Sequence, residues 1–189
     1  MTASLPLWLA IAILVKVESK GPVFFVQKRV GKDGKLFPAY KFRTMIQGAA
    51  DRGAGPLIEG QDDPRITRVG KALRRWSLDE LPQLINILRG EMSVVGPRPT
   101  LLYQVEQYEG FQRRRLEVKP GITGWAQIHG RNLLSWPERI EYDVWYVDNW
   151  TFGLDVEIIL KTLPIWLRKE GLYGDKEKFL IRPQDENRR

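Results

Sequence analysis

Residues Ser77–Leu88 read SLDELPQLINIL, and their apolar side chains recur three or four positions apart. This spacing places the apolar side chains on one side of a helix, so the segment is predicted to form a helix with one apolar face. The stripe consists of Leu81, Leu84, Ile85 and Leu88. An acidic pair, Asp79 and Glu80, comes just before the stripe.

The start of this helix has two interpretations. Ser77 and Glu80 have the spacing of a capping box, which would begin the helix at Ser77. Pro82 would then lie a full turn inside, where its ring meets an earlier carbonyl group. A start nearer Asp79 places Pro82 in the first turn, where proline is tolerated. In both interpretations the acidic pair lies at a helix N-terminus.

Basic residues surround the acidic pair in the sequence. They are Arg74 and Arg75 before it, Arg98 after it, and Lys41 with Arg43 further upstream. As simple helix caps, the two carboxylates would bond the free N–H groups of the first turn. As a functional site, the same helix end would keep Asp79 ionised for nucleophilic attack and attract a phosphate, while arginines or a divalent ion neutralise the charge. Both interpretations stay open on this pattern.

Upstream of the pair, the sequence predicts a β-hairpin. Val23–Val30 and Leu36–Met45 are rich in β-branched and aromatic residues, and Gly31–Gly34 between them has the composition of a turn. Lys41 and Arg43 alternate along the second strand and therefore share one face. Strands and helices together predict an α/β or α+β fold, with a small sheet flanked by helices.

The other segments complete this outline. We predict a loop rich in Gly and Asp over Gln47–Pro64 and a stiff proline-rich loop over Gly96–Pro99. A helix with a basic end follows over Leu101–Leu116, and turn-and-strand material over Lys119–Arg131. Phe152–Leu172 is predicted to form an amphipathic helix kinked by Pro164. The amphipathic helix suits a membrane interface, and packing against the core is its alternative.

The N-terminal part of the chain is apolar. Leu5–Val15 is an unbroken apolar run of eleven residues, whereas a helix needs roughly 20 residues to span a bilayer. The run therefore indicates either a buried core helix or a segment that dips into a membrane. Pro6 and Trp8 favour the membrane-dipping segment.

Composition narrows the class of partner. Lys and Arg total 30 against 23 Asp and Glu, a formal charge of +7 that favours nucleic acid, an anionic membrane surface or a phosphorylated substrate. The absence of cysteine excludes disulfides and thiolate metal sites. Seven tryptophans suit boundaries between water and an apolar phase.

Four segments resemble the bacterial sugar transferase family, the monotopic phosphoglycosyl transferases that charge undecaprenyl phosphate with a first sugar. They are GPVFFVQKRVG, YKFRTM, RVGKALRRWSLDELPQLINILRGEMSVVGPRP and VKPGITGWAQIHGRN. The likeness follows the family's order and spacing from about Pro6 to about Arg168, nearly the whole chain. A likeness over several long motifs is far more specific than a single short motif.

The resemblance implies a two-step covalent reaction. Asp79 would attack the sugar-bearing phosphate of a UDP-sugar and expel UMP, and a polyprenyl phosphate would then attack the phosphosugar intermediate. Glu80 would bind Mg²⁺ or orient the pair, so both carboxylates are the implied metal ligands. The substrate-binding residues expected from the family motifs and the strand pattern are Lys41, Arg43, Arg74, Arg98 and Asp155.

The resemblance also implies a division of the chain. Residues 1–18 would form a membrane-associating helix, 19–173 the catalytic sugar transferase domain, and 174–189 a polar tail. The family's re-entrant helix bends at a proline that matches Pro6. The apolar segment before that proline is short here, with Leu5-Pro6 in place of the family's Ser-Pro pair, so we expect a shortened re-entrant segment.

The partners follow from the same resemblance. They are a UDP-sugar, undecaprenyl phosphate and the anionic surface of the bacterial inner membrane on its cytoplasmic face, with no nucleic acid. Galactose, glucose and N-acetylhexosamines all fit as the sugar, in the first membrane step of exopolysaccharide, capsule or O-antigen synthesis. Oligomeric state stays open, with a homodimer as one arrangement.

Three other classes stay open on the residues alone. A nucleic-acid-binding module explains the basic and aromatic residues, but it leaves the acidic pair and the apolar N-terminus without a role. A non-catalytic membrane-surface scaffold would be unaffected by Asp79→Asn. A hydrolase that uses Asp79 and a metal would not require a lipid phosphate as acceptor.

Overall fold

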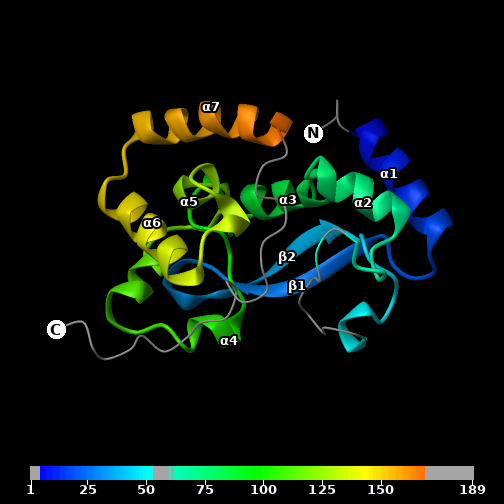
Figure 1. The fold of residues 1–189 in the computed structure, drawn as a ribbon, viewed down its shortest axis with the longest axis horizontal. Coiled ribbons are helices and arrows are strands. Elements are labelled where there is room, and N and C mark those ends of the chain that lie inside the picture. Colours follow the sequence, from blue (N-terminus) through cyan, green and yellow to red (C-terminus); the bar gives the residue numbers. More distant parts are fainter. Residues whose placement is uncertain (1–4, 53–59, 61, 169–189) are drawn as a thin grey trace.

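A computed structural model describes residues 5–52, 60 and 62–168 of the chain. Helices gather around a central β-hairpin, and the longest helix of the described part runs along one edge of the molecule (Figure 1). The same part contains two small two-stranded sheets. The predicted mixed fold, with a small sheet flanked by helices, is confirmed.

The hairpin consists of β1 (Phe24–Val30) and β2 (Leu36–Phe42), which pair antiparallel along their whole length. Asp33 adopts the left-handed conformation in the connecting turn, with φ of 56°. The second strand is shorter than predicted because the chain leaves the ladder before Met45, which pairs only in an isolated bridge with Ile66. Both predicted strands and the turn are otherwise confirmed.

The second sheet places the proline-rich loop. It consists of β3 (Ser93–Val95) and β4 (Gly121–Thr123), which run parallel. A Cβ atom on Gly121 would lie 2.2 Å from the backbone nitrogen of Gly96, so the backbones cross at a distance that only glycine permits. The loop that carries Arg98 begins at this crossing and is therefore held close to β4.

Two helices pack on one end of the hairpin. The N-terminal helix α1 (Leu5–Glu18) and the basic helix α2 (Arg68–Arg75) share a hydrophobic cluster with β2. The buried members are Ile11, Val15, Phe42 and Leu73. The Glu18 carboxylate also accepts hydrogen bonds from the backbone N–H groups of Arg68 and Val69, at 2.7 and 2.9 Å. It thereby caps the N-terminus of α2.

The remaining helices cover the other end of the hairpin. Helix α6 (Trp136–Asp148) packs against β1 and the short helix α4 (Leu102–Val105). The cluster between them comprises Val30, Val105, Tyr108, Trp136, Ile140 and Val144. The longest of these helices, α7 (Phe152–Arg168), packs over β3, β4 and the short helix α5 (Trp125–Ile128) through the fully buried Ile158.

Three local predictions need correction. The helix predicted over Leu101–Leu116 is divided into α4 and a 3₁₀ helix, Gly110–Leu116, which starts where Gly110 turns left-handed with φ of 46°. Lys119–Arg131 contains α5 as well as a strand. Helix α6 has no counterpart among the predicted elements, although Ser135 and Glu138 form a capping pair at its start.

Some predicted segments fall wholly or partly outside the described residues. In the loop predicted over Gln47–Pro64, a 3₁₀ turn covers Ala49–Asp51, while 53–59 and 61 lie outside. Helix α7 continues through Pro164 and is described up to Arg168. The predicted tail, 174–189, lies entirely outside.

The N-terminal helix is partly a core helix. Ile11 and Val15 are buried, and Trp8 packs edge-on against Phe42 with ring centroids 5.7 Å apart. Trp8 therefore faces the hairpin and not an interface. Pro6 lies exposed in the first turn of α1, and the bend predicted there involves residues outside the described part. No helix within residues 5–52 and 62–168 is long and apolar enough to cross a bilayer.

A buried ion pair joins the 3₁₀ helix Gly110–Leu116 to α6. The guanidinium of Arg115 donates to Asp143 at 2.5 Å, and both side chains are 1% exposed. Arg115 also bonds the Tyr108 hydroxyl and the carbonyl oxygen of Arg98. A neighbouring pair, Arg114 with Asp148, links the same two elements in solvent. The buried pair thus ties α6 to the loop of Arg98.

We expect Arg115→Met to make stability fall as pH rises. Burial raises the pKa of Asp143 to about 6, and Arg115 and Arg139 oppose that rise. Without Arg115 the pKa moves higher, so ionising Asp143 near neutral pH costs more in the folded than in the unfolded state. Urea unfolding between about pH 5 and pH 8 should reveal a loss that grows with pH, reaching about 3 kcal/mol.

Arg114→Met is the matched control because it removes the exposed pair between the same elements. Its free energy of unfolding should change far less and should not vary in this way with pH. Equal and pH-independent losses in the two variants would contradict the role given to Asp143.

Candidate active site

The acidic pair lies ahead of its helix and not within it. Ser77 is left-handed, with φ of 48°, and its side chain caps nothing. Leu78–Glu80 form a single 3₁₀ turn, and α3 (Gln83–Leu88) begins only after Pro82. Both predicted helix starts are therefore wrong, because proline ends the preceding turn and opens the helix. The pair occupies the turn that leads into α3.

The buried face of α3 also differs from the predicted one. Gln83 and Asn86 are buried, whereas Leu88, at the end of the apolar stripe, is 69% exposed. Asn86 accepts a hydrogen bond from the backbone N–H of Tyr40 and donates to the carbonyl oxygen of Pro38. Amide hydrogen bonds to β2, together with the packing of Ile87 against Phe37 and Ala39, thus set the position of α3 against the hairpin.

Glu80 is held by two cations from distant parts of the chain. Its Oε1 atom lies 2.6 Å from Lys41 Nζ on β2 and 2.5 Å from Arg98 Nη2 on the proline-rich loop. The second nitrogen of Arg98 lies 3.3 Å from Oε2, so the guanidinium contacts both carboxylate oxygens. Burial would raise the pKa of Glu80, but Arg98 and Lys41 together hold it well below its usual range. Glu80 is therefore ionised at neutral pH.

Asp79 is in a different state. It is half-buried, and the described part of the chain gives its carboxylate no hydrogen bond or ion pair. Burial raises the pKa of Asp79 and the charge of Glu80 adds to the rise, while Lys41, Arg74 and Arg98 oppose it. Two adjacent carboxylates thus differ: Glu80 is fixed by cations, and Asp79 is available to a ligand.

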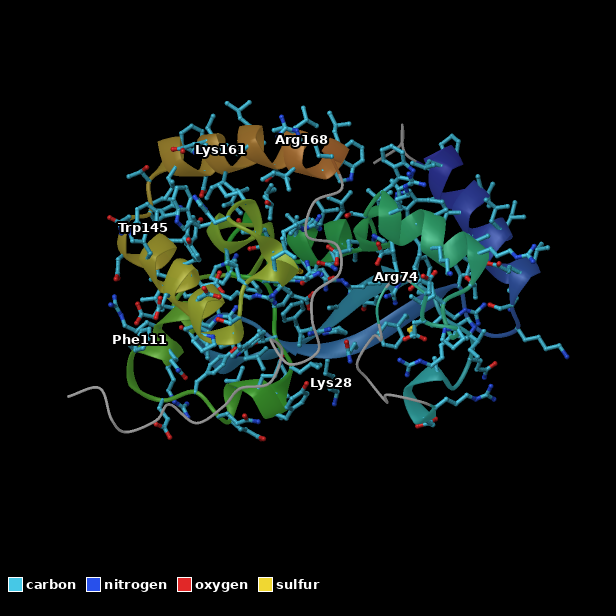
Figure 2. The ribbon with its side chains drawn as sticks, in the orientation of Figure 1. Lys28, Arg74, Phe111, Trp145, Lys161 and Arg168 are labelled. Atoms are coloured by element: carbon cyan, nitrogen blue, oxygen red, sulfur yellow. The ribbon has the colours of Figure 1, made fainter. Side chains whose placement is uncertain are left out.

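Further arginines gather around the pair. Arg74, on α2, is held by Thr44 at 2.8 Å, and Figure 2 places it between α2 and the hairpin. Burial lowers the pKa of Arg131, the charge of Arg98 lowers it further, and Glu80 and Asp79 oppose the change. Burial and Arg98 likewise lower the pKa of Arg29 to about 10. These three arginines therefore interact electrostatically with the acidic pair.

The resulting charge balance favours an anionic ligand. Two carboxylates face Lys41, Arg98, Arg74, Arg131 and Arg29. Several cations in a partly enclosed site attract phosphate and hold it through paired N–H donors. Arg29 and Arg131 were not predicted, although both lie in segments that carry the family likeness. Arg131 has a backbone signal as well, a left-handed φ of 52° in a residue that is not glycine.

Two predicted substrate-binding residues lie elsewhere. The guanidinium of Arg43 donates to the carbonyl oxygens of Val15, Ser19 and Lys20, and so caps the C-terminal end of α1. Asp155 accepts from the Tyr146 hydroxyl at 2.7 Å and from the indole N–H of a nearby tryptophan at 3.2 Å, which fixes the corner between α6 and α7. Both therefore have structural partners, and neither joins the acidic pair.

Comparison with known proteins identifies relatives along the chain. The bacterial sugar transferase family matches residues 1–169. The chain is 50% identical to the uncharacterized sugar transferase EpsL of Bacillus subtilis strain 168, over 84% of this chain and 77% of that protein.

Two relatives have a substrate in their names. Undecaprenyl-phosphate galactose phosphotransferase of Salmonella typhimurium is 42% identical over 81% of this chain. UDP-glucose:undecaprenyl-phosphate glucose-1-phosphate transferase of Escherichia coli K12 is 46% identical over 84% of this chain. The chain spans only 35% of the length of each of these two proteins. With a family match over most of its length, this chain belongs to the bacterial sugar transferase family.

Proposed function

We propose that this chain transfers a sugar 1-phosphate from a UDP-sugar to undecaprenyl phosphate. The observation that supports this most is the division between two adjacent carboxylates, with Glu80 held by Lys41 and Arg98 and Asp79 left unpaired in the described part of the chain. A carboxylate without a partner, among arginines that can bind phosphate, suits a nucleophile for phosphoryl transfer. The names of the two transferases above agree with this reaction.

The proposed reaction has two displacements at one phosphorus atom. First, an oxygen of Asp79 bonds to the phosphorus that bears the sugar, the bond from that phosphorus to the bridging oxygen breaks, and UMP leaves with the electron pair. Second, an oxygen of undecaprenyl phosphate bonds to the same phosphorus, and the bond to Asp79 breaks. The carboxylate is restored, and the lipid carries a diphosphate sugar.

The cations of the site have separate tasks in this proposal. Arg74 and Arg131 would bind the donor's phosphates. The charge of Arg74 lowers the pKa of Asp79, and the charge of Asp79 raises the pKa of Arg131, so both guanidinium groups interact with the nucleophile. Lys41 and Arg98 hold Glu80 and also lower the pKa of Asp79, which favours the ionised nucleophile. The approach of an anionic carboxylate to an anionic diphosphate requires this neutralisation.

The pair also fits a magnesium ion. Mg²⁺ is usually bound by one or two carboxylates together with water and substrate phosphates. Among the described residues no group of three or more His, Cys, Asp or Glu side chains could hold a metal ion by itself. Asp79 and Glu80 would be the protein ligands of Mg²⁺, with Asp79 as the carboxylate that no cation of the described part already pairs. When bound, the ion would neutralise charge on the diphosphate.

A membrane location is also part of the proposal. The outward side of α7 exposes large apolar residues, among them Phe152 at 78% and Leu160 at 68%, and α1 exposes Leu5, Leu9 and others. In Figure 1 both helices lie toward the same side of the molecule. Arg168, at the end of α7, suits anionic headgroups (Figure 2). We therefore place this side on the cytoplasmic face of the bacterial inner membrane.

The direct test is the release of UMP from UDP-galactose, UDP-glucose and their N-acetylated counterparts, with Mg²⁺ and undecaprenyl phosphate in detergent. Asp79→Asn should lower the rate by about 10³-fold or more, because the variant lacks the nucleophile. Asp62→Asn is the matched control, since the side chain of Asp62 is 95% exposed. Release of many UMP per enzyme without the lipid would identify a hydrolase, whereas the proposed reaction allows at most one, and no release from any donor would contradict the proposal.

Lys41→Met should lower kcat/KM by about 10- to 100-fold, because it removes a charge-assisted hydrogen bond to Glu80 and a cation near Asp79. Lys28→Met, an exposed lysine on the other strand of the same hairpin, serves as control and should leave kcat/KM unchanged (Figure 2). Similar losses in the two variants would mean that the hairpin lysines act only through net charge.

Phe152→Glu combined with Leu160→Glu should weaken binding to vesicles of anionic lipid about tenfold or more, because two exposed apolar side chains of α7 no longer enter the lipid. Flotation of the protein with the vesicles measures this. Leu36→Glu places the same charge at an exposed leucine of the hairpin and should change binding little. Equal effects at both locations would argue against α7 as the contact.

A further inference from the structure

A cavity of about 250 Å³ lies beside the acidic pair. Its walls come from the turn before α3, from α3 and α5, and from the inner side of α7. Most of the lining is apolar, and includes Leu81, Leu84, Ile122, Ile165 and Trp76. Glu80 and Arg131 also line it, so the cavity borders the acidic pair at Glu80. Leu81 and Leu84 of the apolar stripe thus line this cavity, although Leu81 also packs against the cluster of α1, α2 and β2.

The cavity is partly open, and contacts between α7 and the rest of the fold form part of its wall. The indole N–H of Trp166 donates to the carbonyl oxygen of Trp76 at 2.8 Å, and the two rings meet edge-on. Thr123 and Thr162 share a hydrogen bond of 2.6 Å across another part of the wall. These polar groups of the lining are therefore satisfied within the protein.

Gln127 is the exception. It lies on α5 in the cavity wall and is 9% exposed, and both Oε1 and Nε2 of its amide are buried with no hydrogen-bond partner in the described part of the chain. Leaving a buried donor and acceptor unpaired is unfavourable, and buried amides normally have partners. The amide turns about a soft torsion, so it can reach a ligand in the cavity without any backbone movement. This arrangement indicates that a ligand supplies the missing bonds.

The chemistry of the amide selects among the parts of the two substrates. An isoprenoid chain offers no hydrogen bonds, and a phosphate offers acceptors only. Sugar hydroxyl groups both donate and accept, as the amide does, and so do the ribose and uracil of the donor. The uridine, however, is bonded to the phosphorus that leaves as UMP and is therefore one phosphate further from Asp79. The glycosyl group is bonded to the phosphorus that Asp79 attacks, so it must lie close to Asp79 and Glu80. A mostly apolar pocket with a few placed polar groups is typical of such a site.

Resting on the function proposed above, we infer that this cavity seats the glycosyl group of the donor and that Gln127 hydrogen-bonds one of its hydroxyl groups. Gln127 is then a residue that determines donor specificity. This inference places the uridine of the donor outside the cavity, against other residues.

Gln127→Met tests this inference because it keeps the side-chain length and removes the amide. The KM for the accepted UDP-sugar should rise about three- to tenfold, the value for one neutral hydrogen bond, while the inhibition constant of UMP stays unchanged. Deoxy-sugar donors locate the contact. The donor that lacks the bonded hydroxyl should lose the same factor with the wild type and nothing further with the variant.

Gln112→Met is the matched control. Gln112 is 8% exposed, and its Oε1 atom accepts a hydrogen bond from the backbone N–H of Glu109, far from the cavity lining. This variant should melt at a lower temperature with an unchanged KM. Gln127→Met should melt no lower than the wild type in the absence of substrate, because it removes an amide that has no partner. A lower melting temperature for Gln127→Met with an unchanged KM would indicate a structural role and overturn the inference.

The remaining outcomes separate the inference from the proposed function. An equal rise in the KM and in the inhibition constant of UMP would assign Gln127 to the nucleotide and overturn the inference alone. If the wild type turns over a UDP-sugar and Gln127→Met leaves the KM for that sugar unchanged, the inference alone is likewise overturned. No turnover of any UDP-sugar by the wild type would overturn the proposed function, and this inference with it.

Discussion

The carboxylate of Glu80 joins three segments that are far apart in the sequence. Lys41 comes from the hairpin, Arg98 from the loop after β3, and Glu80 itself from the turn before α3. A buried carboxylate is stable only when it is paired and hydrogen-bonded, so these segments must stay together. The carbonyl oxygen of Arg98 is in turn held by Arg115, which pairs with Asp143 on α6. The position of Asp79 depends on this chain of charges together with the apolar packing of the flanking Leu78 and Leu81.

The sequence is sufficient to predict those parts of the fold that local patterns determine. The hairpin follows from strand composition and a turn rich in glycine, and the structure has both. The helix starts at Ser77 or Asp79 were wrong because Leu78–Glu80 form a separate 3₁₀ turn and α3 opens only after Pro82, and the left-handed backbone of Ser77 is not signalled by its residue type. The predicted long helix over Leu101–Leu116 likewise had the composition of a helix, but Gly110 interrupts it.

The candidate site divides in the same way. Asp79, Glu80, Lys41 and Arg98 were predicted from motifs, and the structure brings them together. Arg43 shares an alternation pattern with Lys41, yet its side chain bonds the free carbonyl groups at the end of α1, a demand that a strand pattern does not reveal. Gln127 could not be predicted from the sequence, because the feature that singles it out is a buried amide without hydrogen-bond partners in the described part of the chain.

The contacts at the end of α1 have a mechanical consequence. Arg43 on β2 donates hydrogen bonds to the last carbonyl groups of α1, and Glu18 at the end of α1 caps the first turn of α2. These hydrogen bonds couple the orientations of α1 and α2. Arg74 lies in the last turn of α2. A tilt of the N-terminal helix would therefore be transmitted to a guanidinium beside Asp79, which makes the orientation of α1 a determinant of the site's geometry.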